Sequence, residues 1–361
     1  MTKILVYGAG PLGSLFAARL QQGGNDVSIL ARGQRLAELR EHGIVLLDVQ
    51  TQEQTVTQVN VVEGLAPDDV YDLVLVLMRK NHAVQILPVL AAHRHTPNVL
   101  FLMNNAAGPG ALVEALGQER VLIGFPGSAG YREGHVVHCL TGTEADKADV
   151  LLGEVDARIT ERTREVARIL ESAPGFRAEN RTDMDTWHKY HVALLFPSLA
   201  PALYAAGVDN YRLARTRDLV VLYIRAAREA FRVLRSLGLR VTPPKFKVIE
   251  WLPEPILVLL VQRLLANPLM ETALVKHAEA ARSEVQHLID EFLALACTTS
   301  VPTPTIDYLL QYYEPDAPQV PEGSVEIPLR WGGLLVAFGA LAMLVTGGVL
   351  LARWLFGTKR R

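Results

Sequence analysis

The sequence has few cysteines and no marked excess of charge, and we expect no secretory signal. Its two cysteines, Cys139 and Cys297, lie far apart and without the spacing of metal ligands. We expect buried free thiols, which suit a reducing compartment, and no metal site. The formal net charge of -2 gives no electrostatic case for nucleic acid. No charged leader or cleavage site precedes the first apolar segment.

What is abundant is apolar sequence: half of the 361 residues are hydrophobic and a fifth are charged. This composition is typical of a well-buried globular protein, and the length is sufficient for two domains.

The first stretch of the chain predicts a dinucleotide site. A short apolar strand over 3–7 is followed by glycines at the G-x-G-x-x-G spacing and by an amphipathic segment over 15–22. Such glycines permit a tight turn, the approach of a pyrophosphate and close packing of helix on strand. The predicted cofactor contacts are Gly8, Ala9, Gly10, Pro11, Leu12 and Gly13. The alternative is a plain glycine-rich turn.

Arg32 follows the second predicted strand, 26–30. An acidic residue at this position holds the ribose 2′-OH of NAD, whereas a basic residue suits the 2′-phosphate of NADP. The sequence therefore predicts NADPH/NADP as the cofactor. The alternative is an ordinary arginine at the start of a solvated helix.

Continuous apolar strands alternate with amphipathic helices in the first part of the chain, as at 72–77 and 99–102. This pattern indicates a mostly parallel sheet covered on both faces. Ligands bind beyond the carboxyl ends of such strands. The candidates by position are Arg32, Met78, Arg79, Asn104 and Asn105. Shorter strands with glycine turns over 122–152 predict antiparallel additions.

Long helices are expected after Thr182. Thr182 and Asp185 resemble a capping box, and Pro197 should kink the helix that follows. A long amphipathic helix is predicted over 268–296. The apolar segment 251–265 is either a core helix or a patch that lies against a membrane.

The C-terminal run 331–352 contains no charged residue. As a helix it would measure about 33 Å, enough to cross a bilayer. Trp331 and Trp354 stand at its ends, as interfacial aromatics do. We expect a single-pass C-terminal anchor over 329–356, with the membrane as a partner and the catalytic domains in the cytoplasm.

The order and spacing of the motifs resemble the ketopantoate reductase (2-dehydropantoate 2-reductase) family. The likeness runs through the glycine turn, the strand end 30–33, Asn104 in the family's N-G loop, the 124–134 turn and strand, Trp187-x-Lys189, Ser283-Glu284 and 301–304. It covers residues 3–313. The resemblance implies NADPH-dependent reduction of a 2-keto acid such as 2-dehydropantoate, or of a related carbonyl compound.

The resemblance also implies roles for single residues. Lys189 matches the catalytic lysine, the general acid that protonates the developing alkoxide, and Glu284 matches the glutamate at the cofactor and substrate. Asn104 matches the asparagine near nicotinamide and substrate, Ala129 a backbone contact to the cofactor, and Thr272 a substrate-binding serine. The alternatives are a solvated lysine, a solvated glutamate and a turn-forming asparagine.

The sequence departs from the family at several of these places. Ala193 and Pro197 stand where the family has asparagines, one and two turns after its lysine. The family's lysine after the strand 72–77 appears as Arg79 with Lys80 beside it, and N-G becomes Asn104-Asn105. Losing partners for a polar substrate lowers selectivity strongly, so the substrate is less defined than the cofactor.

His188 and His191 flank Lys189 and are either substitute polar contacts or structural residues. Two further functions stay open: a reductase of a larger, apolar carbonyl compound, and a non-catalytic NADP-binding sensor or scaffold at a membrane. A homodimer is a further open alternative.

The predicted fold is an α/β Rossmann-type domain followed by an all-α domain and one transmembrane helix. The predicted segments are 1–178 for NADP binding, 179–314 for substrate and catalysis, 315–328 as a linker, 329–356 as the transmembrane helix and 357–361 as a basic tail.

Overall fold

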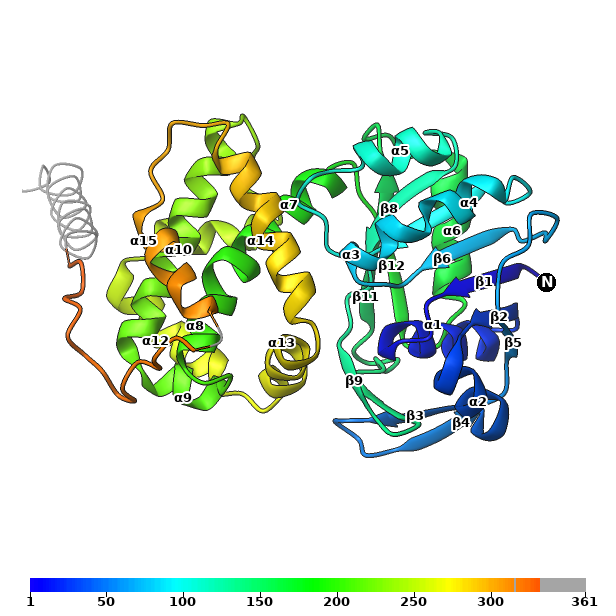
Figure 1. The fold of residues 1–361 in the computed structure, drawn as a ribbon, viewed down its shortest axis with the longest axis horizontal. Helices are drawn as coiled ribbons and strands as arrows, with labels where there is room; N and C mark the ends of the chain where they lie inside the picture. The colour runs from blue at the N-terminus through cyan, green and yellow to red at the C-terminus, as the bar shows by residue number, and fades with distance from the viewer. Residues whose placement is uncertain (315, 332–361) are drawn as a thin grey trace, which may run out of the picture.

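The computed structural model describes residues 1–314 and 316–331. Figure 1 shows strands gathered in one lobe and helices in the other, with the helix α7 (Met184–Leu194) at their junction. The last strand ends at Asn180, and helices make up the regular structure from Met184 onward in the described residues. A Rossmann-like α/β fold followed by a helical region is therefore confirmed.

The main sheet has the strand order β12-β11-β8-β7-β6-β1-β2-β5. Its strands are β1 (Lys3–Tyr7), β2 (Asp26–Leu30), β5 (Asn60–Val62), β6 (Leu73–Val76), β7 (Asn98–Leu102), β8 (Val121–Phe125), β11 (Ala148–Glu154) and β12 (Phe176–Asn180). Neighbouring strands pair in parallel except β8 and β11, which run antiparallel. The sheet is mostly parallel, as the apolar strands predict.

Helices cover both faces of this sheet. They are α1 (Pro11–Gln22), α2 (Gly33–His42), α3 (Lys80–Ala83), α4 (Leu87–Ala92), α5 (Gly110–Leu116) and α6 (Glu161–Glu171). Alternate residues of β1 point to opposite faces: Ile4 belongs to the apolar core with residues of α1 and α6, and Leu5 to the core with residues of α4 and α5. Burial on both faces explains why β1, β6 and β7 are continuously apolar.

A second sheet has the order β4-β3-β10-β9. Its strands are β3 (Ile44–Asp48), β4 (Gln54–Thr57), β9 (Gly130–Glu133) and β10 (Val136–Cys139). The pairs β3–β4 and β9–β10 are antiparallel, which confirms the antiparallel additions. Both cysteines are free, but only Cys139 is buried; Cys297 is exposed, so the prediction of burial was wrong for it.

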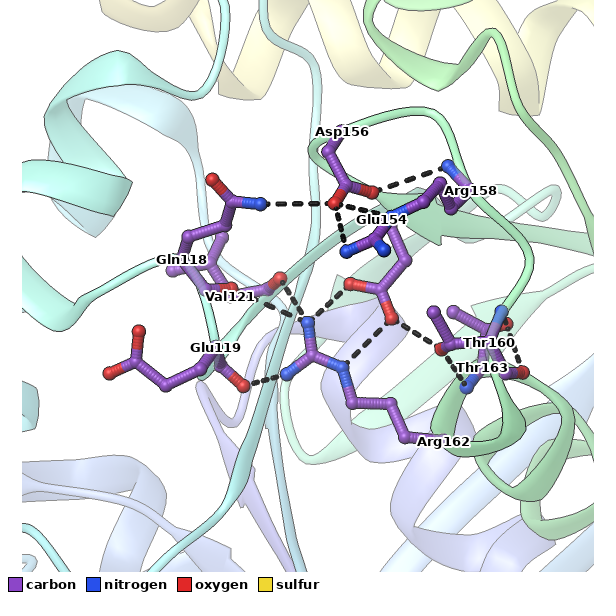
Figure 2. A network of polar contacts seen from close by, with 9 residues as sticks. All are labelled: Gln118, Glu119, Val121, Glu154, Asp156, Arg158, Thr160, Arg162 and Thr163. Atoms are coloured by element: carbon purple, nitrogen blue, oxygen red, sulfur yellow. Dashed lines mark hydrogen bonds and ion pairs between the residues drawn. The ribbon is translucent and has the colours of Figure 1, made fainter.

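An ionic network fastens α6 to the edge of the main sheet (Figure 2). The Nε of Arg162 donates to Oε1 of Glu154 at 2.9 Å, and its terminal nitrogens contact Glu154 and the backbone oxygens of Glu119 and Val121. Thr160 donates to the same Glu154 carboxylate. The surface pocket beside these residues has a volume of about 490 Å³. Because the guanidinium is bonded within the protein, we assign the network a structural role.

The helical region begins with α7. It continues with α8 (Ala200–Ala205), α9 (Asn210–Arg215), α10 (Arg217–Ser236), α11 (Val248–Trp251), α12 (Glu254–Leu265), α13 (Lys276–Ala280), α14 (Arg282–Ala296) and α15 (Pro304–Leu310), with π-helical turns at Leu195–Leu199 and Glu271–Val275 and 3-10 turns at Pro244–Lys247 and Gln311–Tyr313. In the first lobe, a 3-10 turn at Val84–Ile86 joins α3 to α4. The central helix α10 packs against α7, α12 and α15.

Three local predictions need comment. Pro197 does interrupt its helix, and the interruption takes the form of a π-helical turn. The capping box at Thr182 was wrong: the N-cap position of α7 is Asp183, whose side chain makes no capping hydrogen bond, and the carboxylate of Asp185 contacts Lys189. The long helix over 268–296 was also wrong, because Ala281 leaves helical geometry (φ -124°, ψ 29°) and separates α13 from α14.

The predicted membrane location is corrected. Within residues 1–314 and 316–331, no helix combines the length and apolar character that crossing a bilayer requires. The helix α12 is apolar but has 12 residues, and the 20-residue α10 carries charged side chains along its length. The predicted span 329–356 lies, beyond its first three residues, outside the described residues.

The segment 251–265 has some side chains in the helical core and others on the surface. Leu257 and Val258 of α12 are buried in the helical core, whereas Leu259 and Leu264 are exposed.

Candidate active site

The glycine turn has the geometry that its spacing predicts. Gly8 has a φ of 120°, which favours glycine, and a Cβ on Gly13 would overlap the backbone oxygen of Gly8. A Cβ on Gly10 would meet nothing within 4 Å. Pro11 then opens α1, whose first N–H groups are free of helical partners. Close packing at Gly13 and open space at Gly10 fit the pyrophosphate of a dinucleotide.

A buried arginine supports this turn. Arg35 donates from Nε to the backbone oxygen of Ala9 at 3.2 Å and from a terminal nitrogen to Oγ of Ser14 at 3.0 Å. Burial, the largest effect, lowers the pKa of Arg35. The partners of Arg35 lie on other elements, so no local sequence pattern indicated its role. Arg32 is exposed at the end of β2, where its Nε donates to the backbone oxygen of Glu63.

The residues after β6 lie between the glycine turn and α14. A Cβ on Gly8 would lie 2.8 Å from the Met78 side chain, so Met78 borders the turn. Arg79 is half-buried and caps α3. Lys80, expected only to preserve charge beside Arg79, is buried, and its Nζ donates to Oδ1 of Asn105 at 2.6 Å.

Asn104 and Asn105 have different environments. Asn105 is buried and closes a turn: its Oδ1 accepts from the N–H of Gly108 and its Nδ2 donates to the Gly108 oxygen, both at 3.0 Å. The turn-forming role considered for Asn104 thus belongs to Asn105. The Oδ1 of Asn104 is buried and has no partner among the described residues. A buried acceptor of this kind requires a donor, and a cofactor or substrate N–H or O–H fits that need.

Lys189 is buried on α7, which rules out the solvated alternative. Its ammonium forms an ion pair with Asp185, one turn earlier on the helix. A Cβ on Gly108 would lie 3.4 Å from the Lys189 Nζ and 3.1 Å from Oδ1 of Asp185. Lys189 therefore faces the turn that Asn105 closes. The i,i+4 spacing of Asp185 and Lys189 was a readable signal for this pair.

Glu284 is buried in the first turn of α14 rather than on a solvated face. Its Oε1 accepts from the backbone N–H of Lys80 at 3.3 Å, and its Oε2 lies 3.7 Å from Nε2 of His277. Burial raises the pKa of the Glu284 carboxyl group, with the N–H of Lys80 and the charge of Arg79 acting in the opposite direction. The carboxyl group can therefore take up a proton at a pH closer to neutrality than a carboxyl group in water can.

Other predicted positions lie elsewhere. Ala129 precedes β9, and its backbone oxygen accepts from the N–H of Leu140 at 2.9 Å. Thr272 is buried in the π-helical turn Glu271–Val275, which packs against β9. In the described part of the chain, no hydrogen bond or ion pair joins Ala129 or Thr272 to Lys189.

The face of α7 that carries Lys189 continues into apolar core. Ala193 is fully buried among apolar side chains, and Pro197 is buried in the π-helical turn. The side chains of Ala193 and Pro197 neither donate nor accept hydrogen bonds, in contrast to the asparagines that the family has at these positions.

The neighbouring histidines fit the structural alternative. Nε2 of His188 lies 3.0 Å from the backbone oxygen of Gly124, and burial lowers the pKa of His188 to about 4. His191 stacks on Trp187 with ring centroids 4.8 Å apart and also contacts Phe125. Burial, the largest effect, lowers the pKa of His191 to about 3.

The structure thus gathers Lys189, Asn104 and Glu284 where α3, α7 and α14 meet. It adds Asp185, Lys80 and a further carboxylate, Glu291, whose Oε1 lies 3.4 Å from Nζ of Lys80. Sequence reasoning did not single out Glu291 because it lies about two hundred residues after its partners.

The chain is similar to known proteins in sequence and in fold. Residues 4–154 match the family described as ketopantoate reductase PanE/ApbA. YkpB, an uncharacterized oxidoreductase of Bacillus subtilis (strain 168), is 28% identical over 195 residues, which are 52% of this chain and 61% of YkpB. The match thus spans less than two thirds of YkpB. A 2-dehydropantoate 2-reductase of Archaeoglobus fulgidus is 27% identical over 240 residues, which are 65% of this chain and 75% of that enzyme.

A solved structure extends the likeness of fold to the helical region. The ternary structure of D-mandelate dehydrogenase with NADH and anilino(oxo)acetate superposes with a TM-score of 0.70 and 15% identity, and covers 86% of this chain and 96% of that one. At this identity the likeness shows the fold alone. Residues 4–154 of this chain are thus similar to the ketopantoate reductase PanE/ApbA family, the family that the order of the sequence motifs resembles.

Proposed function

We propose that the protein is an NADPH-dependent reductase that transfers hydride to a 2-keto acid or a related carbonyl compound, with Lys189 as general acid. The observation that carries this proposal is the buried Lys189 ammonium, which faces the Asn104–Gly108 turn at the junction of the two lobes. A buried ammonium that faces a turn with an unpartnered acceptor suits a reaction in which a carbonyl oxygen gains charge and a proton.

The chain offers a consistent set of cofactor contacts. The glycine turn 8–13 would hold the pyrophosphate, and Arg32 the 2′-phosphate. The unpartnered Oδ1 of Asn104 would accept a hydrogen bond from the nicotinamide end of the cofactor or from the substrate. Glu284 would lie in the same region, where it contacts the backbone N–H of Lys80. When bound, NADPH supplies the hydride. D-mandelate dehydrogenase was solved with NADH, so the preference for NADPH rests here on Arg32.

In this proposal Lys189 stabilises and protonates the alkoxide that forms from the carbonyl group. Asp185 keeps the ammonium in place through a charge-assisted contact. Glu284 positions the backbone of Lys80 and lines the same region.

The candidate site has an apolar side near Lys189. Ala193 and Pro197 offer no hydrogen bond, and Phe196 packs edge-on to His277 at a centroid distance of 6.5 Å. These observations favour the second candidate, a keto acid with a larger apolar group, over a polyhydroxylated one. D-mandelate dehydrogenase was solved with anilino(oxo)acetate, a 2-oxo carboxylate that carries an aromatic anilino group.

The test is oxidation of NADPH and NADH by the full chain with a panel of 2-keto acids that bear small, hydroxylated, branched and aromatic groups. We expect turnover with NADPH and a preference for the apolar members. Lys189→Ala should reduce kcat by roughly a hundredfold or more while NADPH binding is retained. Lys147→Ala, on the surface of the first lobe, is the matched control. Tight NADPH binding without turnover of any carbonyl would indicate the non-catalytic sensor instead.

A further inference from the structure

Asn105, which stands where the family pattern has a glycine, contacts Lys80, the neighbour of the Arg79 that replaces the family's lysine. The Nζ of Lys80 donates to Oδ1 of Asn105 at 2.6 Å. Both side chains are buried, and they follow two neighbouring strands, β6 and β7. Where the family pattern has a glycine, the amide of Asn105 thus supplies an oxygen that binds a buried ammonium.

A third residue, Glu291 of α14, completes this group. Its Oε1 lies 3.4 Å from the Lys80 Nζ, and its side chain is 11% exposed. Its Oε2 accepts from the backbone N–H groups of Ala106 and Ala107 at 2.9 and 3.0 Å. One carboxylate therefore binds both the ammonium and the turn that contains Asn105.

The charges around Lys80 explain why this carboxylate matters. Burial, the largest effect, lowers the pKa of Lys80, and Lys189 acts in the same direction, whereas Glu291 and Asp185 raise it. Glu284 contacts only the backbone N–H of Lys80, and Nε2 of His287 lies 3.3 Å from Oε1 of Glu291. Without Glu291, Lys80 would keep only the weaker effect of Asp185, the carboxylate that forms the ion pair with Lys189.

We propose that Glu291 is a positioning residue of the candidate active site. It holds the Lys80 ammonium and the backbone at Ala106 and Ala107 together, and so fixes the turn that carries Asn104 opposite Lys189. The consequence for catalysis rests on the proposed reductase function, whereas the positioning of the turn does not.

The experiment compares Glu291→Ala, Glu291→Gln and Asp290→Asn in the full chain. Asp290 is the matched control because it is the adjacent, exposed carboxylate of the same helix and accepts from Gln286. Hydrogen exchange of the peptide that contains residues 104–108 reports on the turn without any need for activity. Steady-state kinetics with NADPH and a turned-over keto acid then report on catalysis.

Glu291→Ala should accelerate exchange at Ala106 and Ala107 roughly tenfold or more, since both N–H groups lose their acceptor. It should lower kcat roughly tenfold while leaving the Kd of NADPH within about twofold. Glu291→Gln keeps an acceptor oxygen but loses the charge. It should retain slow exchange, and the loss of activity at high pH should begin at a lower pH, because the pKa of Lys80 falls further.

Parent-like exchange in Glu291→Ala would overturn the proposal, as would an equal effect of Asp290→Asn. Accelerated exchange with unchanged kcat would reduce Glu291 to a structural contact and overturn its catalytic consequence. If the parent turns over no carbonyl compound, the proposed function fails, and the exchange comparison still decides whether Glu291 fixes the turn.

Discussion

Asp185 and Lys189 lie one turn apart on α7, and the carboxylate of the first forms an ion pair with the ammonium of the second. The lysine is buried, whereas the Asp185 side chain is 39% exposed. The pair therefore orients the ammonium from its solvent side and leaves its other side toward the turn at Gly108.

Asp185→Asn should lower kcat roughly tenfold, because an amide binds the ammonium more weakly than a carboxylate. The Kd of NADPH should stay within about twofold. Steady-state kinetics and fluorescence titration measure the two quantities, with Asp290→Asn as the control. An unchanged kcat would show that packing alone orients Lys189.

Arg32→Ala should weaken NADPH binding roughly ten- to a hundredfold and leave NADH binding unaltered, because only NADPH carries the 2′-phosphate. Titration of both cofactors tests this selectivity. Arg40→Ala is the control, since Arg40 is exposed on α2, the helix that follows Arg32, and pairs with Glu63. Equal losses for NADH and NADPH would contradict the role of Arg32.

Gly13→Ala should lower the free energy of unfolding by about 1–3 kcal/mol, because the new methyl group would overlap the backbone oxygen of Gly8. It should also weaken the binding of both cofactors. Urea unfolding followed by circular dichroism gives the stability. Gly64→Ala is the control, since a Cβ there meets nothing within 4 Å. Equal stability of the two variants would refute close packing at Gly13.

His188 should make stability fall in mild acid. Burial lowers its pKa in the folded chain from 6.5 to about 4, so the unfolded chain binds more protons between these values. The free energy of unfolding should therefore decrease as the pH falls from about 6.5 toward 4, by up to about 1.4 kcal/mol per pH unit from this group.

Thermal unfolding of the parent and of His188→Gln across this pH range isolates the contribution. The variant should show the smaller loss in acid, and the exposed His95→Gln should behave like the parent. Parallel curves for the parent and His188→Gln would mean that His188 is protonated alike in both states.

The parts of the fold that could be predicted from the sequence are those that depend on a pattern of neighbouring residues. The strands at β1, β6 and β7, the glycine turn and the proline interruption all follow from neighbouring residues. The position of Asp185 in the sequence fits two roles. A carboxylate near the start of a helix can take part in a capping box or form an ion pair with a lysine one turn later. No proline or glycine lies beside Ala281, so the sequence does not indicate that the helix ends there.

The candidate site was predictable as a set of residue types, but not as an arrangement. The burial of Lys80 and of Arg35 depends on partners from distant elements, such as Glu291 and Ser14. A local pattern carries no information on which distant carboxylate will meet a lysine. Asn105 illustrates this limit, because its departure from the N-G pattern gains meaning only when Lys80 lies beside it.

The contact between the backbone of Lys80 and Glu284 joins positions 204 residues apart. During synthesis at about 5–20 residues per second, Lys80 is made roughly 10–40 s before Glu284. Throughout that interval the ammonium of Lys80 and the amides of Ala106 and Ala107 must be solvated by water. The nascent first lobe therefore exposes, at the edge where α14 later packs, a surface that only the end of the chain can close.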